Sequence, residues 1–160
     1  MRFVAEVMLG RLVKWLGVLG FDAHYQSFDP VQDIIKMAQQ GRAPLTRQRK
    51  MIPLLKGAVF IRDNGLREQL AQLREPFLLE SSAADWFSRC IRCNVVLINA
   101  PQGEARNNVP EYVFYEKMDS IRSCPSCGRY FWPGCHKIRM EKQLNEWGFV
   151  NPFLDLVTKS

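Results

Sequence analysis

The chain has 160 residues, of which 47% are hydrophobic and 24% charged, so it can bury one core or two small ones. Its formal net charge is +6 and its pI about 9.2, which favours a polyanionic partner such as nucleic acid. No apolar run is long enough to span a membrane, and Glu6 interrupts the apolar stretch that a signal peptide would need. We therefore expect a cytoplasmic protein without a membrane segment.

Short apolar strands alternate with amphipathic helices along the first eighty residues. Strands are predicted at 3–5, 23–25, 43–46 and 58–61, with a further candidate at 77–79, and helices at 8–19, 29–40, 47–55 and 66–74. Pro44 indicates that the third strand is irregular or partly exposed, whereas the strand at 58–61 is expected to be buried. The alternation predicts an α/β domain over residues 1–80, with a parallel sheet flanked by helices on both faces.

Ligands of such sheets bind beyond the carboxyl ends of the strands. The polar residues that follow the predicted strands are Glu6, Thr46, Arg47, Gln48, Asp63 and Asn64. Because the ends of parallel strands meet at one edge, we expect any site of the first domain to lie there.

The composition changes near Ser81-Ser82-Ala83-Ala84, where we place a domain boundary. In the second domain, residues 84–149, we predict a strand at 95–98, a polar loop at 101–108, an aromatic strand at 129–132 and a helix within 134–149. Residues 150–160 form a tail. The aromatic side chains of the strand at 129–132 are expected to build a small core, with one or two of them exposed for stacking on bases.

Two Cys-x-x-Cys pairs dominate the second domain. Cys90 with Cys93 and Cys124 with Cys127 have the spacing of knuckles, tight turns that direct two thiolates at one metal ion. Four thiolates complete a closed tetrahedral site, so the pattern predicts structural Zn²⁺. Two disulfides or four unrelated thiols are the alternatives, and the double spacing disfavours both. A fifth cysteine, Cys135, is expected to be a free thiol in a reducing cytoplasm.

Three parts of the chain resemble the Mut-seven C-terminal ribonuclease domain family. They are the opening Ala5 to Leu16 with Leu19-Gly20-Phe21-Asp22, the segment Leu45-Thr46-Arg47, and the cysteine half with Cys124-Pro125-x-Cys127-Gly128-Arg129 and Trp132 to His136. The resemblance covers nearly the whole chain and is most specific in the opening stretch and the knuckles. It implies a PIN-like nuclease domain followed by a zinc ribbon, in which clustered carboxylates hold Mg²⁺ or Mn²⁺ and RNA is cut.

The resemblance implies a catalytic role for Glu6, and Asp33 and Asp63 are the other candidate ligands of Mg²⁺ or Mn²⁺. Hard cations take oxygen ligands, and the bound ion activates water for phosphodiester cleavage. Each acid also has a simpler interpretation: Glu6 beside a helix N-terminus, Asp33 as a solvated helix residue and Asp63 as a turn residue. The chain departs from the family pattern twice, because Glu6 stands in place of Asp and Gln48 ends the motif expected to read Thr-Arg-Asp.

Basic residues near these acids are candidates for binding RNA phosphates. Arg11 and Lys14 lie one helical turn apart, although such a pair is more commonly a solvated face. Arg47 and Gln48 follow the third strand and are further candidates for RNA contacts. His136 follows Cys135 and either faces RNA, supports the zinc ligands or simply starts a helix.

Three functions agree with these features. The first is a metal-dependent ribonuclease that hydrolyses RNA phosphodiester bonds. The second is a catalytically impaired PIN-like protein that binds RNA, because Gln48 is a much poorer metal ligand than a carboxylate. The third is an adaptor that uses the zinc ribbon to bind other proteins.

Overall fold

The structure is a computed structural model that describes residues 1–25, 31–77 and 85–149. The chain divides into two compact units, Met1–Phe87 and Ser88–Ser160. The boundary predicted at 81–84 and the tail at 150–160 lie outside the described residues. So do residues 78 and 79 of the strand candidate at 77–79, whereas Phe77 ends a helix. Within those residues, no helix is long and apolar enough to cross a membrane.

The first unit is built on a four-stranded parallel sheet in the order β2-β1-β3-β4. The strands are β1 Arg2–Ala5, β2 Asp22–Tyr25, β3 Ala43–Thr46 and β4 Val59–Phe60. Ala5 lies opposite Tyr25 of β2 and Leu45 of β3, so the carboxyl ends of these three strands meet at one edge. The predicted α/β class with a parallel sheet is confirmed.

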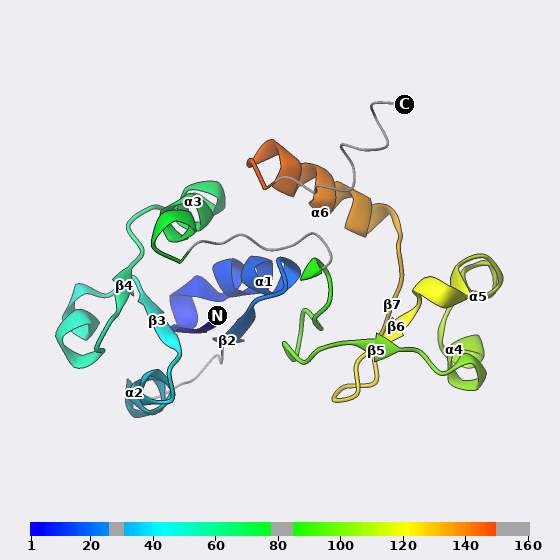
Figure 1. The fold of residues 1–160 in the computed structure, drawn as a ribbon, viewed down its shortest axis with the longest axis horizontal. Helices are drawn as coiled ribbons and strands as arrows, with labels where there is room; N and C mark the ends of the chain where they lie inside the picture. The colour runs from blue at the N-terminus through cyan, green and yellow to red at the C-terminus, as the bar shows by residue number, and fades with distance from the viewer. Residues whose placement is uncertain (26–30, 78–84, 150–160) are drawn as a thin grey trace. The chain divides into compact units, whose positions relative to one another are not determined.

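Helices cover both faces of this sheet (Figure 1). They are the 3-10 turn η1 Val7–Leu9, α1 Gly10–Val18, α2 Val31–Gln39, the 3-10 helix η2 Arg49–Leu54 and α3 Leu66–Phe77. Right-handed crossovers place α1 and α3 on one face, and α2 and η2 on the other. On the second face Val4 packs with Ile34, Met51 and Leu55 in a buried cluster, which fixes α2 and η2 against β1.

The third strand differs from the prediction, because Pro44 is buried in the interior of the sheet. Proline disrupts the hydrogen bonds between two strands only where a carbonyl of the neighbouring strand requires the N–H that proline lacks. The Leu45 carbonyl accepts from the Glu6 N–H on the β1 side, and the Thr46 carbonyl accepts from the Ile61 N–H on the β4 side. In a parallel strand the backbone groups of alternate residues point to the same neighbouring strand, so the backbone nitrogen of Pro44 points to β4, as the backbone of Thr46 does. Pairing between β3 and β4 begins only at Leu45, so the ladder begins after Pro44.

The fourth strand is shorter and less buried than the buried strand predicted at 58–61. β4 spans only Val59–Phe60, is half-buried and forms one edge of the sheet. Gln72 of α3 covers this edge: its Nε2 donates to the Phe60 carbonyl (2.6 Å), and its Oε1 accepts from the Arg62 N–H (3.1 Å). A side-chain amide therefore satisfies the backbone groups that an edge strand leaves open.

The second unit carries a three-stranded antiparallel sheet in the order β5-β6-β7. Its elements are β5 Ile98–Asn99, α4 Gln102–Asn108, α5 Glu111–Lys117, the 3-10 turn η4 Met118–Ser120, β6 Arg122–Ser123, β7 Tyr130–Phe131 and α6 Cys135–Glu146. The aromatic strand and the last helix are confirmed. The strand predicted at 95–98 is reduced to Ile98 in β5, with an isolated bridge at Val96.

The prediction of a polar loop at 101–108 is wrong, because residues 102–108 form the helix α4. Its one fully buried side chain, Ala105, packs with Val113 and Ile121 in the core of the unit. Tyr130 and Trp132 pack against the same cluster, so the aromatic side chains serve mainly as core. One small apolar residue in seven leaves no visible helical period, which explains the error.

The close approach of Gly20 to Asp85 supports a prediction about the stability of the first unit. Gly20 has φ +92°, and a Cβ there would lie 2.5 Å from the Asp85 carbonyl oxygen. Gly57 has φ +74° with nothing within 4 Å. We expect Gly57→Ala to cost about 1–2 kcal/mol from backbone strain alone, and Gly20→Ala about 3 kcal/mol or more, because the backbone must also move. Urea unfolding monitored by circular dichroism measures both, and equal losses would contradict the contact.

Candidate functional site

The two knuckles of the second unit repeat one backbone geometry. The Cys90 N–H donates to the Val95 carbonyl (2.8 Å), and the Cys124 N–H donates in the same way to the Arg129 carbonyl (2.9 Å). The residue after each second cysteine has a left-handed backbone, with φ 58° at Asn94 and 69° at Gly128. Their N–H groups return to the carbonyls of the first cysteines, at 2.8 and 2.9 Å. Each turn therefore presents two sulfur atoms on one side.

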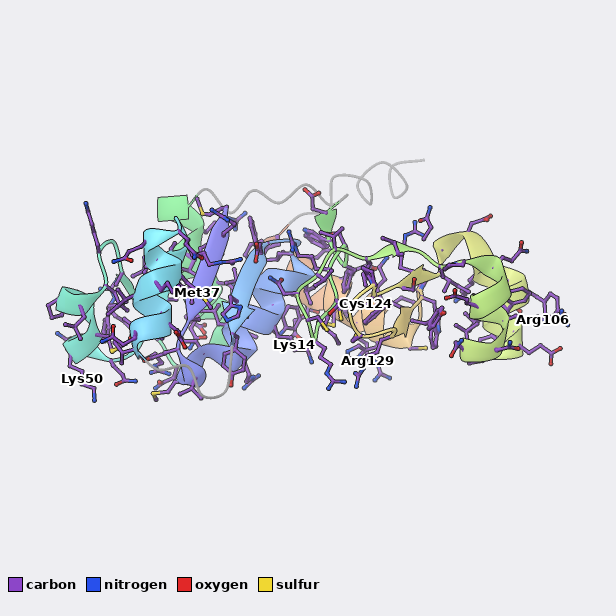
Figure 2. All side chains as sticks on the ribbon, turned by 90° about the horizontal axis from the view of Figure 1, so that it is seen from below. Lys14, Met37, Lys50, Arg106, Cys124 and Arg129 are labelled. Atoms are coloured by element: carbon purple, nitrogen blue, oxygen red, sulfur yellow. The ribbon has the colours of Figure 1, made fainter. Side chains whose placement is uncertain are left out.

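The four predicted cysteines converge on one point. The Sγ atoms of Cys90, Cys93, Cys124 and Cys127 all lie within 4.8 Å of one another, and Cys124 lies among the knuckle turns (Figure 2). The Sγ atoms of Cys90 and Cys127 are 3.7 Å apart. A Zn²⁺ ion with four sulfurs at about 2.3 Å requires about 3.8 Å along each edge of the tetrahedron. The donor set and its spacing therefore fit a metal such as zinc.

The electrostatics of the cluster also favour a bound cation. Burial raises the pKa of the Cys90 thiol to about 12, whereas the Arg129 backbone N–H lowers the pKa of Cys127 to about 7. The pKa of Cys93 is raised mainly by its hydrogen bond with Cys127. Four thiolates this close repel one another unless a cation compensates them, so metal binding and deprotonation are coupled.

Neither Cys135 nor His136 belongs to this cluster. Both are exposed in the first turn of α6. The cluster contains four cysteines and no histidine, so the expectation of a free thiol at Cys135 is confirmed. A role for His136 toward RNA stays a prediction.

These contacts predict one zinc ion per chain, held by Cys124 and its three partners. We expect Cys124→Ser to remove the zinc and to unfold the second unit, because structural zinc contributes folding free energy directly. Cys135→Ser is the matched control and should retain the zinc and the folded second unit. Metal analysis of the purified proteins, together with circular dichroism before and after chelator, gives the answer. Full zinc content in Cys124→Ser would contradict the site.

The carboxyl edge of the first unit centres on Glu6. Its backbone is extended and its N–H still donates to the Leu45 carbonyl, so Glu6 continues the ladder between β1 and β3. The side chain is only 3% exposed. Its Oε1 accepts from the Arg47 backbone N–H (2.5 Å), and its Oε2 accepts from Gln48 Nε2 (2.7 Å). Both carboxylate oxygens are thus bound by the chain that follows β3.

A local turn aims these donors at Glu6. The Gln48 N–H donates to the buried Thr46 Oγ1 (3.0 Å), which closes the backbone immediately after β3. The Arg47 guanidinium then donates to Asn64 Oδ1, beyond β4. Hydrogen bonds from Arg47 and Gln48 therefore connect the ends of β1, β3 and β4. Gln48 acts here as a donor to a carboxylate, which a metal ligand at this position would not do.

The other predicted acids do not join Glu6 in a preformed cluster. Asp33 is exposed in the first turn of α2. Asp63 is exposed after β4, and its backbone carbonyl accepts from Gln69 Nε2 (2.9 Å). Over the described ranges, the cysteines form the one group of three or more potential ligands within 4.8 Å, and no acid is part of it. Catalytic metal binding by Glu6, Asp33 and Asp63 stays a prediction.

The predicted phosphate-binding residues are solvent-accessible. Arg11 and Lys14 are exposed on α1 and Arg47 is half-buried beside Glu6. Arg49 lies over the Phe60 ring, with its guanidinium carbon 5.0 Å from the ring centre, and Lys50 projects outward from η2 (Figure 2). The end of β3 is therefore basic around one buried acid.

Two structural residues were missed in the sequence. Asn94 takes the left-handed backbone conformation in the first knuckle, as Gly128 does in the second. The signal for this role is the shared pattern Cys-x-x-Cys followed by Asn or Gly. Arg42 binds both oxygens of Asp22, at 2.8 and 3.1 Å, and donates to the Phe3 carbonyl. Arg42 therefore joins the amino ends of β1, β2 and β3, and no spacing in the sequence predicts its pairing with Asp22.

Comparison with known families agrees with both halves of this structure. The family model described as the Mut7-C RNAse domain matches residues 1–144. The chain belongs to this family. The Mut7-C match includes the sheet that carries Glu6 and all four cysteines, and it indicates a ribonuclease-like function. No curated protein and no solved structure gives a significant match to the chain.

The contact between Glu6 and Gln48 predicts how this Mut7-C site responds to metal. Gln48→Ala removes a donor to a buried charge and should cost about 1.5–3 kcal/mol. Gln48→Asp places a second carboxylate against Glu6 and should cost more in the presence of a chelator. Added Mg²⁺ or Mn²⁺ should restore stability only in Gln48→Asp, because a cation between two carboxylates removes their repulsion. Thermal unfolding with and without metal compares the two, and an equal metal response would refute the contact.

Proposed function

We propose that the chain is a metal-dependent ribonuclease that hydrolyses RNA phosphodiester bonds at the carboxyl edge of its parallel sheet. The observation that carries this proposal is the buried Glu6 carboxylate beyond the ends of β1 and β3. Ligands of parallel sheets bind at this edge, and the family is a ribonuclease domain family. A buried acid at such an edge is a candidate for chemistry rather than for stability.

Glu6, Asp33 and Asp63 supply the oxygen ligands for Mg²⁺ or Mn²⁺ in this proposal. When bound, the ion activates water and stabilises the charge that develops on the phosphate. Glu6 is held in place by its hydrogen bonds, whereas Asp33 and Asp63 are exposed. These two acids would have to approach Glu6 to share an ion with it, and the charge of that ion would offset their mutual repulsion.

Arg11, Lys14 and Arg47 bind RNA phosphates in this proposal, and Gln48 and His136 add polar contacts to the RNA. Arg47 is the best placed, because its backbone N–H holds Glu6 while its guanidinium extends toward Asn64. Cationic contacts to phosphate release counterions, so the affinity for RNA must fall as the salt concentration rises.

Gln48 keeps the rate of cleavage low. Its amide occupies Glu6 Oε2, and a cation that binds this oxygen must displace the amide. Gln48 then offers only a neutral carbonyl oxygen in place of a charged ligand. The site is thus able to take the ion but binds it weakly.

A second function is favoured by the same contact. If the hydrogen bonds from Arg47 and Gln48 fully replace the cation, the chain binds RNA without cutting it. Both oxygens of Glu6 already have donors, and in the described part of the chain no other carboxylate gathers with it. The third function, an adaptor built on the zinc ribbon, differs from both because it needs no affinity for RNA.

A cleavage assay separates these functions. With Mn²⁺ and a labelled single-stranded RNA, we expect slow cleavage by the wild-type chain. Glu6→Gln should lower the rate at least about 100-fold, the order seen when one group that stabilises the transition state is removed. Gln48→Asp should raise the rate about tenfold or more by supplying a charged ligand. Cys135→Ser is the control and should leave the rate unchanged.

The binding of the same RNA in chelator identifies the alternatives. No cleavage by wild type or Gln48→Asp, with salt-dependent RNA binding retained, would replace the nuclease proposal by the RNA-binding one. No salt-dependent RNA affinity in either chain would exclude both and leave the adaptor. Fluorescence anisotropy over a range of salt concentrations provides this measurement.

A further inference from the structure

A second candidate site lies at the amino end of the parallel sheet. A shallow, open cavity of about 450 Å³ lies there, at the strand ends opposite to Glu6. Four residues at about 3.3 Å each make β1 roughly 13 Å long, which separates the two edges. The cavity is lined by Met1, Arg2, Gly41, Arg42, Ala43, Pro44, Lys56 and Gly57. These residues come from the starts of β1 and β3 and from the turn before β4.

The lining carries three cationic side chains and no acidic side chain. Arg42 is neutralised by Asp22, at 2.8 Å, and serves as part of the wall. Arg2 donates to the Gln40 carbonyl (2.8 Å), a neutral acceptor that leaves its charge uncompensated. Lys56 is exposed, and its ammonium makes no hydrogen bond or ion pair with any residue that the structure describes. Among the residues that the structure describes, no acid pairs with Arg2 or Lys56, so these two positive charges face the cavity without a counter-charge there.

Two glycines shape the space beside these cations. Gly41 has φ +83°, and a Cβ there would lie 3.5 Å from Arg2 Nη2, so the guanidinium rests directly against this turn. Gly57 has φ +74°, and a Cβ there would meet nothing within 4 Å, which leaves the opposite wall open. With one nitrogen fixed on Gln40, the remaining donors of Arg2 are available to an oxyanion in a defined direction.

We propose that this cavity binds a phosphate monoester, with Arg2 and Lys56 as the charged contacts. A dianion matches the two uncompensated cations, and the planar guanidinium matches its oxygens. The ligand is either a free nucleotide or the phosphorylated end of an RNA, and both present the same group. The site is independent of the proposed nuclease function, because it uses none of the residues at the carboxyl edge.

The test compares two double variants with equal changes in net charge. Arg2→Gln with Lys56→Gln removes both contacts; Arg67→Gln with Arg106→Gln removes two exposed cations outside the cavity. Inorganic phosphate, a nucleoside 5′-monophosphate and the unphosphorylated nucleoside are titrated into each zinc-loaded protein by calorimetry. The wild type and the control should bind the two phosphates with roughly millimolar affinity and ignore the nucleoside. The first variant should bind at least about tenfold more weakly.

Two results would overturn the proposal: no saturable phosphate binding by the wild type, or equal binding by the cavity variant. To identify the source of the phosphate, we compare the binding of RNA with a 5′-phosphate and of the same RNA with a 5′-hydroxyl. Both are titrated in chelator so that no cleavage occurs. Tighter binding of the phosphorylated RNA, lost in the cavity variant, identifies an RNA end; equal binding of both RNAs identifies the free nucleotide. Loss of RNA cleavage in Glu6→Gln would not change either result.

Discussion

The arrangement of the first unit depends on how one buried carboxylate is compensated. A charge that is removed from water must be paired or hydrogen-bonded, and Glu6 obtains both donors from the chain that follows β3. Those contacts hold the end of β1 against the end of β3, and Arg47 extends the connection to Asn64 beyond β4. At the edge where a parallel sheet presents its ligand site, the one buried carboxylate therefore receives its hydrogen bonds from neutral groups. A ligand that binds to Glu6 must therefore displace the hydrogen bonds from Arg47 and Gln48 or bind beside them.

The four cysteines play a different part. Their two knuckles share one hydrogen-bond pattern, which places four sulfur atoms at the spacing that zinc requires. Such a closed site would leave no open position for a substrate, so we expect a bound metal to stabilise the second unit rather than to take part in catalysis. The fit of the cysteines to a metal therefore gives no support to a catalytic ion, which in our proposal depends on a single buried acid and two exposed ones.

Much of this organisation follows from local patterns in the sequence. The alternation of strands and helices predicts the parallel sheet, and it places Glu6 and Gln48 at adjacent strand ends. The knuckles follow from spacing alone, since each is a short turn with its own hydrogen bonds. By contrast, α4 was missed because Ala105 alone marks its buried face. Local patterns succeed where one segment satisfies its own backbone groups.

Contacts between distant segments could not be predicted in this way. From the sequence, Gln48 appeared to be a weak metal ligand, but its amide nitrogen donates to the Glu6 carboxylate. The turn at Thr46 determines whether the amide nitrogen or the amide oxygen of Gln48 faces Glu6. Pro44 appeared incompatible with an interior strand, and only the short length of β4 makes it harmless. The pair of Arg42 with Asp22 joins residues twenty positions apart. Each of these depends on tertiary register rather than on neighbouring residues.

The most direct test of a nuclease site at Glu6 is to locate the divalent ion itself. Titration of the zinc-loaded, ¹⁵N-labelled chain with Mn²⁺ broadens the amide signals nearest to the bound ion. If Glu6 is the centre of the nuclease site, the signals of Arg47 and Gln48 should broaden first, because their donors contact its carboxylate. Glu6→Gln should abolish that effect. Broadening that is uniform, or that centres on an exposed acid such as Asp33 and persists in Glu6→Gln, would contradict a metal site at Glu6.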